Sequence, residues 1–175
     1  AGWNVAIGHG NGPQVGFLLR RSEISHATEG MSEVPLDVCG ADSQGEIGYA
    51  LQQTLQNWLF KRNIKQNVAT VITQVLVDHE DPAFKKPTQP IGGFMDETEA
   101  KRREKELGWN VVEDSGRGWR RVVASPLPKE VVEIESVQAL LNTGVVVITV
   151  GGGGIPVIDT GNGDYAGTAA VIDKD

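Results

Sequence analysis

"VVVITVGGGG", residues 145–154, joins a continuous apolar run directly to four glycines. A run that is apolar throughout and rich in β-branched side chains is typical of a strand covered on both faces, as in a parallel sheet. Glycine lets the backbone approach a ligand closely and adopt unusual dihedral angles. The stretch therefore predicts a buried parallel strand ending at a loop, and such sheets bind ligands beyond the carboxyl ends of their strands.

A second glycine-rich loop lies near the start of the sequence. The predicted strand WNVAI, residues 3–7, is followed by GHGNGPQVG, residues 8–16. Pro13 suits the first turn of a helix, and backbone N–H groups at a helix start can bind an anion. A single loop of this kind is explained equally well by a tight turn. Two such loops, each directly after a buried strand, favour phosphate binding.

Neither loop matches a standard nucleotide motif. The sequence GxxxxGK[ST] of a Walker A loop is absent from both. In the first loop no third glycine falls at the dinucleotide-binding spacing, and Pro13 removes a backbone donor. A dinucleotide-binding Rossmann site is therefore a poor interpretation.

Helical and strand patterns alternate through most of the sequence. Helices are predicted from about Pro13, over 42–60 and over 128–144, where Val131, Ile134, Val137 and Leu141 would share one face. A continuous buried strand is predicted over 68–77 and a polar loop over 24–37. Asp42 or Ser43 is the candidate N-cap of the second helix. Its predicted apolar face consists of Ile47, Leu51, Leu55 and Trp58. This alternation predicts an α/β fold with a mainly parallel sheet and helices on both faces.

Residues 79–122 differ in composition from the rest. A proline-rich loop is followed by the polar helix DETEAKRREKEL, residues 96–107, with Gly108 as its C-cap, and then by a hairpin. The helix has almost no apolar stripe, so it cannot belong to the main core. We predict an inserted subdomain over 79–122 and a core domain formed by 1–78 and 123–175. Arg117, Arg120 and Arg121 are interpreted as surface charges of the hairpin.

Composition excludes some classes of protein. The 175 residues carry a formal net charge of −7, which argues weakly against a nucleic-acid partner. The apolar runs are far shorter than the ~20 residues of a membrane span, and a cytoplasmic location is the default. One cysteine, Cys39, allows no internal disulfide and is interpreted as a structural thiol rather than a reactive one. Spacing typical of metal ligands is absent, so no metal site is predicted.

Two candidate groups lie close to the glycine loops. His9 could act as an acid or base, a ligand or a packing residue, and a structural or hydrogen-bonding role is favoured. Asp173, Lys174 and Asp175 form a triplet that in most proteins would indicate a solvent-exposed turn. Beside phosphate-binding loops, the same triplet could supply a lysine that offsets transferring charge.

The chain resembles the carbamate kinases of the amino-acid-kinase superfamily. The segments that carry the resemblance occur in order along almost the whole sequence: HGNGPQVG, PLDVCGADSQGEIGY, TQVLVDHEDPAFKKPTQPIG, GRGWRRVVASPLP, GGGGIPV and AVIDKD. The resemblance implies a three-layer αβα sandwich with a protruding lid, which would correspond to 79–122, in a homodimer. It implies reversible phosphoryl transfer between ATP and carbamate, giving ADP and carbamoyl phosphate, with Mg2+ held mainly by the nucleotide phosphates.

The resemblance also assigns roles to residues of this chain. Gly10, Asn11 and Gly12 would bind carbamate or carbamoyl phosphate, and Gly152 and Gly153 the transferring phosphoryl group. Gly151 and Gly154 would lie at the nucleotide phosphates. Lys174 would balance charge in the transition state, and Asp175 would orient catalytic lysines.

One residue departs from the family pattern. The lid motif normally reads PTKPIG, whereas this sequence has Gln89 in place of the lysine. A neutral amide can hydrogen-bond to a phosphoryl group but cannot offset its charge. Gln89 is therefore a substrate-binding candidate. Two alternatives to a carbamate kinase remain: a non-catalytic anion-binding module, or a kinase for another small carboxylate.

The resemblance also concerns length. The family has a first strand and loop before this sequence begins and a nucleotide-binding half after it ends. The 175 residues are therefore expected to be a fragment that does not turn over alone.

Overall fold

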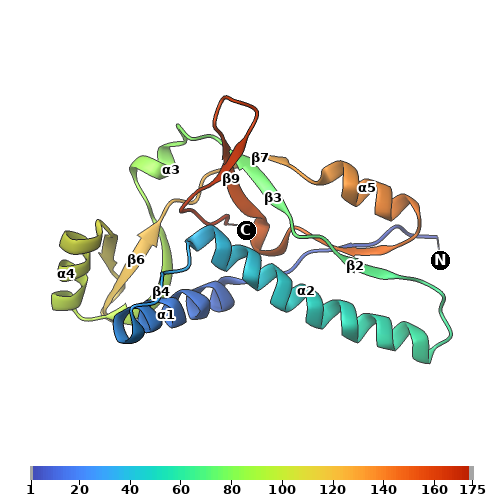
Figure 1. Ribbon diagram of the computed structural model, residues 1–175, viewed down its shortest axis with the longest axis horizontal. Coiled ribbons are helices and arrows are strands. Elements are labelled where there is room, and N and C mark those ends of the chain that lie inside the picture. Colours follow the sequence, from blue (N-terminus) through green and yellow to red (C-terminus); the bar gives the residue numbers. More distant parts are fainter. Residues whose placement is uncertain (1, 174–175) are drawn as a thin grey trace.

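The computed structural model describes residues 2–173, which form a mixed α/β fold with helices on both sides of its sheets (Figure 1). The helices are α1 (Gly12–Glu29), α2 (Leu36–Lys61), α3 (Pro82–Lys85), α4 (Glu97–Leu107) and α5 (Ile134–Asn142). The strands are β1 (Ala6–Ile7), β2 (Val68–Thr70), β3 (Gln74–Val77), β4 (Gln89–Met95), β5 (Asn110–Glu113), β6 (Trp119–Val123), β7 (Pro128–Val131), β8 (Val146–Ile148), β9 (Ile155–Asp159) and β10 (Tyr165–Gly167).

The described strands form three sheets. In the first, of order β1-β8-β2, both pairs are parallel, and Figure 1 shows α2 and α5 on opposite sides of it. The second, of order β10-β9-β3-β7, pairs β3 with β9 in parallel and adds an antiparallel strand at each edge. Strand β7 occupies the start of the segment 128–144 that was predicted to be helical, so the helix there is confined to α5. The layers are those of a three-layer sandwich, with parallel pairing at the centre of both sheets.

Two chain segments pass from the first sheet into the second. The predicted strand 68–77 is divided into β2 and β3, and the segment after β8 continues through the glycine loop into β9. Thr73 and Thr149 lie at the two crossings, and their Oγ1 atoms are 2.8 Å apart. The prediction of one continuous strand over 68–77 was wrong because apolar character marks burial but not the sheet to which a strand belongs. The seam between the sheets lies at the glycine loops.

Three glutamines on one face of α2 bind the ends of the strands. Gln56 Oε1 accepts a hydrogen bond from Val68 N (3.0 Å), and Gln52 Oε1 accepts one from Thr70 N (2.8 Å). Gln44 Oε1 accepts one from Thr73 N (2.8 Å). Spacings of eight and four residues keep these side chains on one face of a helix. This glutamine ladder, Gln44, Gln52 and Gln56, fixes α2 along the strands by hydrogen bonds.

The ladder corrects the predicted apolar face of α2. Leu51 is 37% exposed and Trp58 is 47% exposed, and neither lies in the buried core of the described chain. Leu59, which the pattern did not select, is buried with Val68 and Ile148. The helix also begins at Leu36 with Pro35 as its N-cap, so neither Asp42 nor Ser43 caps it. Ser43 is instead fully buried.

Helix α1 is longer than predicted. It begins at Gly12 beside Pro13 and continues to Glu29, so the first part of the predicted loop 24–37 is helical. Gly30 ends the helix in the left-handed conformation (φ +67°), with its N–H donating to His26 O. Val15 and Leu19 pack with Leu36 of α2 and Ile91 of β4, so α1 joins the main helices to the third sheet.

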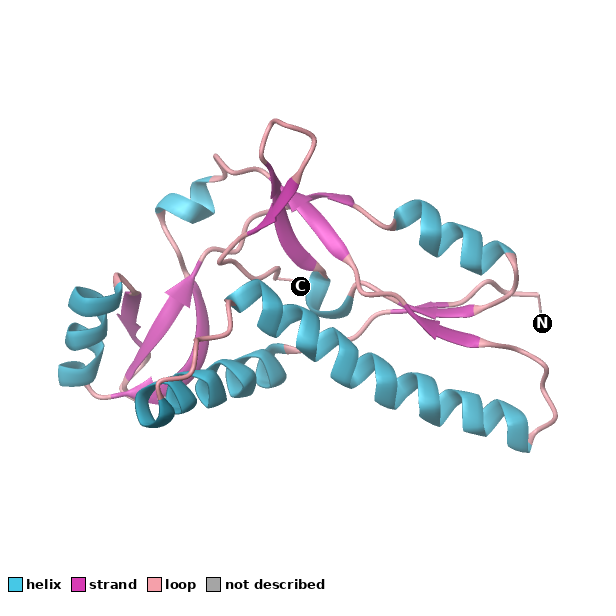
Figure 2. Cartoon of the chain, in the orientation of Figure 1, coloured by secondary structure: helices cyan, strands magenta, loops and turns pink. Residues whose placement is uncertain are grey.

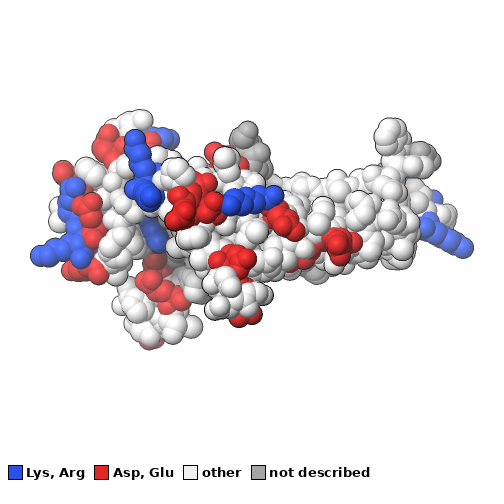
Figure 3. Space-filling model, turned by 90° about the horizontal axis from the view of Figure 1, so that it is seen from above, with Lys and Arg blue, Asp and Glu red and all other residues white. Residues whose placement is uncertain are grey.

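The third sheet, of order β4-β6-β5, is antiparallel and is set apart from the other two (Figure 2). The predicted polar helix is α4, with Asp96 Oδ1 accepting from Glu99 N (2.8 Å) at its start and Gly108 as its C-cap. The predicted hairpin is the β5–β6 pair, whereas the segment predicted as a proline-rich loop contains α3 and β4. Figure 3 shows charged side chains of both signs gathered at the α4 end of the molecule.

Helix α4 is tied to α1 by an ion-pair network. Arg103 bonds Glu99 on its own helix (2.6 Å) and Glu23 on α1 (2.9 Å). Arg102 also bonds Glu99 (2.8 Å). These hydrogen bonds from Arg102 and Arg103 lower the pKa of Glu99 to about 2.

The shifted pKa predicts a pH dependence of stability. Because the folded-state pKa of Glu99 lies below its ordinary value of 4.5, its contribution is full above pH 4.5 and is lost as the pH falls through about 2. We expect Glu99→Gln to lower the urea midpoint at pH 7, and the difference from wild type to shrink towards pH 2. Glu97→Gln, which keeps both arginine contacts of Glu99, is the control. A difference that persisted unchanged to pH 2 would contradict the pKa assignment.

Close packing between α2 and β2 gives a second prediction. A Cβ at Gly48 would overlap Thr70 Cγ2 and lie 3.1 Å from its Oγ1, whereas a Cβ at Gly45 meets no atom within 4 Å. We expect Gly48→Ala to lower the free energy of unfolding by about 1–3 kcal/mol. Gly45→Ala should raise it by ~0.5–1 kcal/mol through helix propensity. Urea unfolding of both variants checks this, and Thr70→Ser, which removes Cγ2, should recover part of the Gly48→Ala loss.

None of the helices within residues 2–173 is both long and apolar enough to cross a membrane.

Candidate active site

The two glycine-rich loops meet at the seam between the first two sheets. Gly152 N donates to His9 O at 2.7 Å, which joins the loops directly. Gly153 N donates to Val150 O and Gly154 N to Gly151 O, both at 3.1 Å, so residues 150–154 form a tight turn, with positive φ at Val150, Gly152, Gly153 and Gly154. The loops that the sequence placed after two strands thus form one backbone structure.

Asn11 lies against Gly152 across this junction. Its Nδ2 donates to Ser43 Oγ at 2.8 Å. A Cβ at Gly152 would overlap the Asn11 side-chain amide, and the backbone there is left-handed (φ +63°). Both observations require glycine at position 152, because any side chain would displace Asn11.

Val150 enters the second loop in a conformation that is rare for its residue type. Its φ of +52° is left-handed, and a β-branched side chain seldom adopts this region. Val150 N donates to Thr73 Oγ1 at 3.1 Å, and Thr73 is fully buried. Strained backbone of this kind persists where the surroundings fix it, and it gathers at functional sites.

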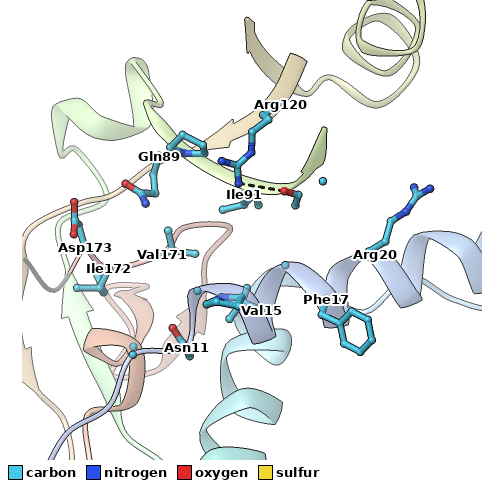
Figure 4. Close-up of a pocket in the computed structure, with 18 residues that line it drawn as sticks. Asn11, Val15, Phe17, Arg20, Gln89, Ile91, Arg120, Val171, Ile172 and Asp173 are labelled. Carbon is cyan, nitrogen blue, oxygen red and sulfur yellow. Dashed lines mark hydrogen bonds between the residues drawn. The ribbon is translucent and has the colours of Figure 1, made fainter. Parts of the chain in front are cut away.

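A cavity of about 660 Å3 opens beside the joined loops (Figure 4). Asn11 and Gly152 line it from the loops, and Gln89 and Arg120 line it from the third sheet. In Figure 4 the Gln89 and Asn11 side chains lie on opposite sides of this space. The cavity is therefore lined both by the glycine loops and by residues of the third sheet.

Among residues 2–173, the positively charged side chains that line this cavity are arginines. Arg20 comes from α1 and Arg120 from β6, and Asp173 is the carboxylate of the lining. Arg120 donates to Gly92 O at 3.1 Å, and its Nη1 lies 3.6 Å from Asp114 Oδ2. Its buried Nε has no hydrogen-bond partner among the described residues. The cavity is thus lined by two guanidinium groups, the side-chain amides of Asn11 and Gln89, and the start of helix α1, which suits a small anion.

The predicted site residues fall into four groups. Gly10, Asn11, Gly12, Gln89 and Gly152 line the cavity. Gly153 lines an adjoining cavity of about 550 Å3, which shares Gly10, Ile172 and Asp173 with the first. Gly151 and Gly154 are buried, packed against Gln44 and Val75 respectively. Lys174 and Asp175 lie outside the described residues.

His9 contributes through its backbone and its packing. Its Nδ1 donates to Gly10 O at 3.0 Å, and its ring lies where a Cβ of Gly151 would be. These contacts support the structural role that was favoured from the sequence. No group of three or more His, Cys, Asp or Glu side chains within 2–173 is arranged to hold a metal ion.

Sequence reasoning missed several residues of the site. Arg120 was interpreted as a surface charge, but strand alternation places it and Arg121 on opposite faces of β6, so one of them had to face inward. Arg121 stacks on Trp109 at 4.5 Å, and burial lowers its pKa. Ser43 and Gln44 were hidden because a polar residue within a helix gives no pattern of its own.

Cys39 has no access to this site. It is fully buried in the core between α1, α2 and β4. Burial is the largest cause raising the pKa of its thiol, followed by the charge of Asp42. A neutral buried thiol supports the structural interpretation.

Comparison with known proteins relates this geometry to a family, although no family model matches the chain. The carbamate kinase of Pyrococcus horikoshii is 54% identical over 174 residues, covering 99% of this chain and 55% of that protein. The chain is homologous to about half of a carbamate kinase. The carbamate kinase of Pyrococcus furiosus is 56% identical with the same coverage.

A solved structure extends the likeness to the fold. The carbamate kinase of Giardia lamblia bound to AMP-PNP superposes with a TM-score of 0.89 at 44% identity, over 99% of this chain and 54% of that one. The chain thus spans about half the length of the carbamate kinases that it matches.

Proposed function

We propose that the protein to which this chain belongs is a carbamate kinase, which transfers a phosphoryl group reversibly between ATP and carbamate. The observation that carries the proposal is the direct junction of the two glycine loops, through Gly152 N and His9 O, at a cavity lined by Asn11. Homology to the carbamate kinases supports the substrates. AMP-PNP bound to the Giardia enzyme supports ATP as the nucleotide.

The reaction needs positioning and charge neutralisation more than covalent chemistry. In the direction of ATP formation, the bond between phosphorus and the carbamoyl oxygen breaks while an ADP β-phosphate oxygen bonds to phosphorus. Gly10, Asn11 and Gly12 would hold the carbamoyl group, and Gly152 and Gly153 would hold the transferring phosphoryl group. Lys174 would offset its charge and Asp175 would orient lysines.

The two buried glycines have a different part in this proposal. Gly151 and Gly154 remain predicted to lie at the nucleotide phosphates. Their burial supports a contribution made through the shape of the loop, since Gly154 N closes the turn by donating to Gly151 O. Mg2+ would enter as the complex with ADP or ATP, held mainly by their phosphates.

Two further proposals concern the segment 79–122 and the exposed face of α2. We propose that residues 79–122 act as a lid over the cavity, because Gln89 and Arg120 face the glycine loops across it. Exposed apolar side chains on α2, including Tyr49 (65% exposed) and Phe60 (65% exposed), support a homodimer formed through that helix. We also propose that the protein is located in the cytoplasm.

Gln89 favours a second candidate function. Without an ammonium at this position, the site could bind carbamoyl phosphate or another small carboxylate without rapid transfer. The two functions are separated by mixing the intact gene product with carbamoyl phosphate and MgADP and following ATP by a coupled assay. ATP formation supports the kinase. Binding of carbamoyl phosphate by calorimetry with no ATP formed would support the anion-binding module instead.

A further inference from the structure

Two adjacent residues of α2, Ser43 and Gln44, contact the two glycine loops. Ser43 is fully buried and Gln44 is 2% exposed. Ser43 contacts Asn11 of the first loop, and Gln44 contacts Gly151 of the second. We propose that Ser43 and Gln44 form a loop clamp: positioning residues that set the first loop's Asn11 amide against the second loop's backbone. The proposal rests on the proposed function, because it assigns these residues to the same site.

Ser43 determines which way the Asn11 amide faces. The Ser43 hydroxyl donates its proton to Gly40 O at 2.7 Å, so its oxygen is left to accept from Asn11. Only the Nδ2 end of the Asn11 amide can donate, which places Nδ2 towards Ser43 at 2.8 Å. The buried serine thereby fixes the orientation of the side chain that lines the cavity.

Gln44 uses both ends of its amide at the seam between the sheets. Its Nε2 donates to Gly151 O at 2.9 Å and to Thr73 O at 3.1 Å, and its Oε1 accepts from Thr73 N at 2.8 Å. Thr73 in turn holds Val150 through its Oγ1. The strained turn is thus held at Gly151 by Gln44 directly and at Val150 by Thr73, whose backbone Gln44 also binds. A shift of the turn would leave buried polar groups without partners, which is costly.

The chain offers a matched control on the same helix. Gln56 also bridges two backbone groups, donating to Gln66 O at 3.1 Å and accepting from Val68 N at 3.0 Å. It belongs to the glutamine ladder and lies at the end of α2 away from the glycine loops. Gln44→Met and Gln56→Met therefore remove the same kind of interaction, and only the first touches the loop clamp.

The first experiment compares these two variants in the intact gene product. We expect Gln44→Met to lower kcat for ATP formation by about 10–100-fold with a smaller change in KM, because a small misplacement of the reacting groups is costly. Gln56→Met should keep the wild-type kcat. Hydrogen exchange without substrate should be at least ~10-fold faster at Gly152–Gly154 in Gln44→Met than in Gln56→Met. Equal kcat and equal exchange in the two variants would overturn the loop clamp.

The second experiment does not depend on the folding of Gln44→Met. In a double-mutant cycle, Ser43→Ala should lower kcat about 10-fold in the wild type and hardly at all in an Asn11→Ala background. Equal effects in both backgrounds would mean that Ser43 acts by general stability, and would overturn its positioning role. Wild type that forms no ATP would refute the proposed function. The exchange measurement at Gly152–Gly154 would then still decide the loop clamp.

Discussion

Gly152→Ala is expected to lower the rate of ATP formation by about 100–1000-fold. A Cβ at this position would overlap the Asn11 side-chain amide, and the glycine N–H donates to His9 O at 2.7 Å. The substitution would therefore displace a substrate-binding group and the phosphoryl-binding backbone together. A misplacement of about 1 Å in groups that position the substrate can cost about 100-fold in rate, and here two such groups move together. Steady-state kinetics with carbamoyl phosphate and MgADP measures the change.

A second left-handed glycine separates this effect from backbone strain. Gly108 caps α4 at φ +66°, and a Cβ there meets no atom within 4 Å. Gly108→Ala should cost ~1–2 kcal/mol of stability from the left-handed conformation while leaving kcat unchanged. If Gly152→Ala retained the kcat of Gly108→Ala, the contact between Asn11 and Gly152 would have no part in catalysis.

Gln89→Lys is expected to raise the rate of ATP formation by about 100-fold. Gln89 opens β4, pairs with Val123, and lies across the cavity from Asn11. A lysine ammonium there would stabilise the negative charge of the transferring phosphoryl group, which a neutral amide cannot do. Because this interaction strengthens in the transition state, kcat should rise more than the affinity for carbamoyl phosphate.

Two controls test whether the gain in rate requires a positive charge and requires it at residue 89. Gln89→Met keeps the size of the side chain and should give no gain. Gln138→Lys adds the same charge at an exposed position of α5 and should also leave the rate unchanged. A rate for Gln89→Lys equal to that of wild type would show that residue 89 does not reach the phosphoryl group in the working enzyme.

Local signals in the sequence predicted local structure well. Helix α4 has its N-cap at Asp96 and its C-cap at Gly108, because both caps are set by residues within one turn of the helix ends. The glycine loops were also predicted at their observed places, since each follows a short strand, but only β8 is buried as predicted, whereas β1 is largely exposed. What the sequence could not supply was their hydrogen bond, which joins Gly152 to His9 across most of the chain.

The contact face of α2 shows a different limit. Periodicity selects apolar side chains, whereas this helix meets the strands through Gln44, Gln52 and Gln56. Their partners are backbone N–H groups, which have no signature in the sequence. The same limit hid the loop clamp, because a buried serine or glutamine is recognised only once its partners are in place.

The glutamine ladder also implies an order of assembly. Its contacts join residues 12 apart at Gln56, 18 at Gln52 and 29 at Gln44, and 107 apart where Gln44 meets Gly151. Loop-closure entropy rises with the length of chain enclosed, so the shortest contact should form first. We expect the contacts between α2 and the strands to form in order from Gln56 to Gln44, and the glycine loops to become ordered last. Pulsed hydrogen exchange during refolding would then protect Val68 before Gly152, which makes the active site the latest-formed part of this fold.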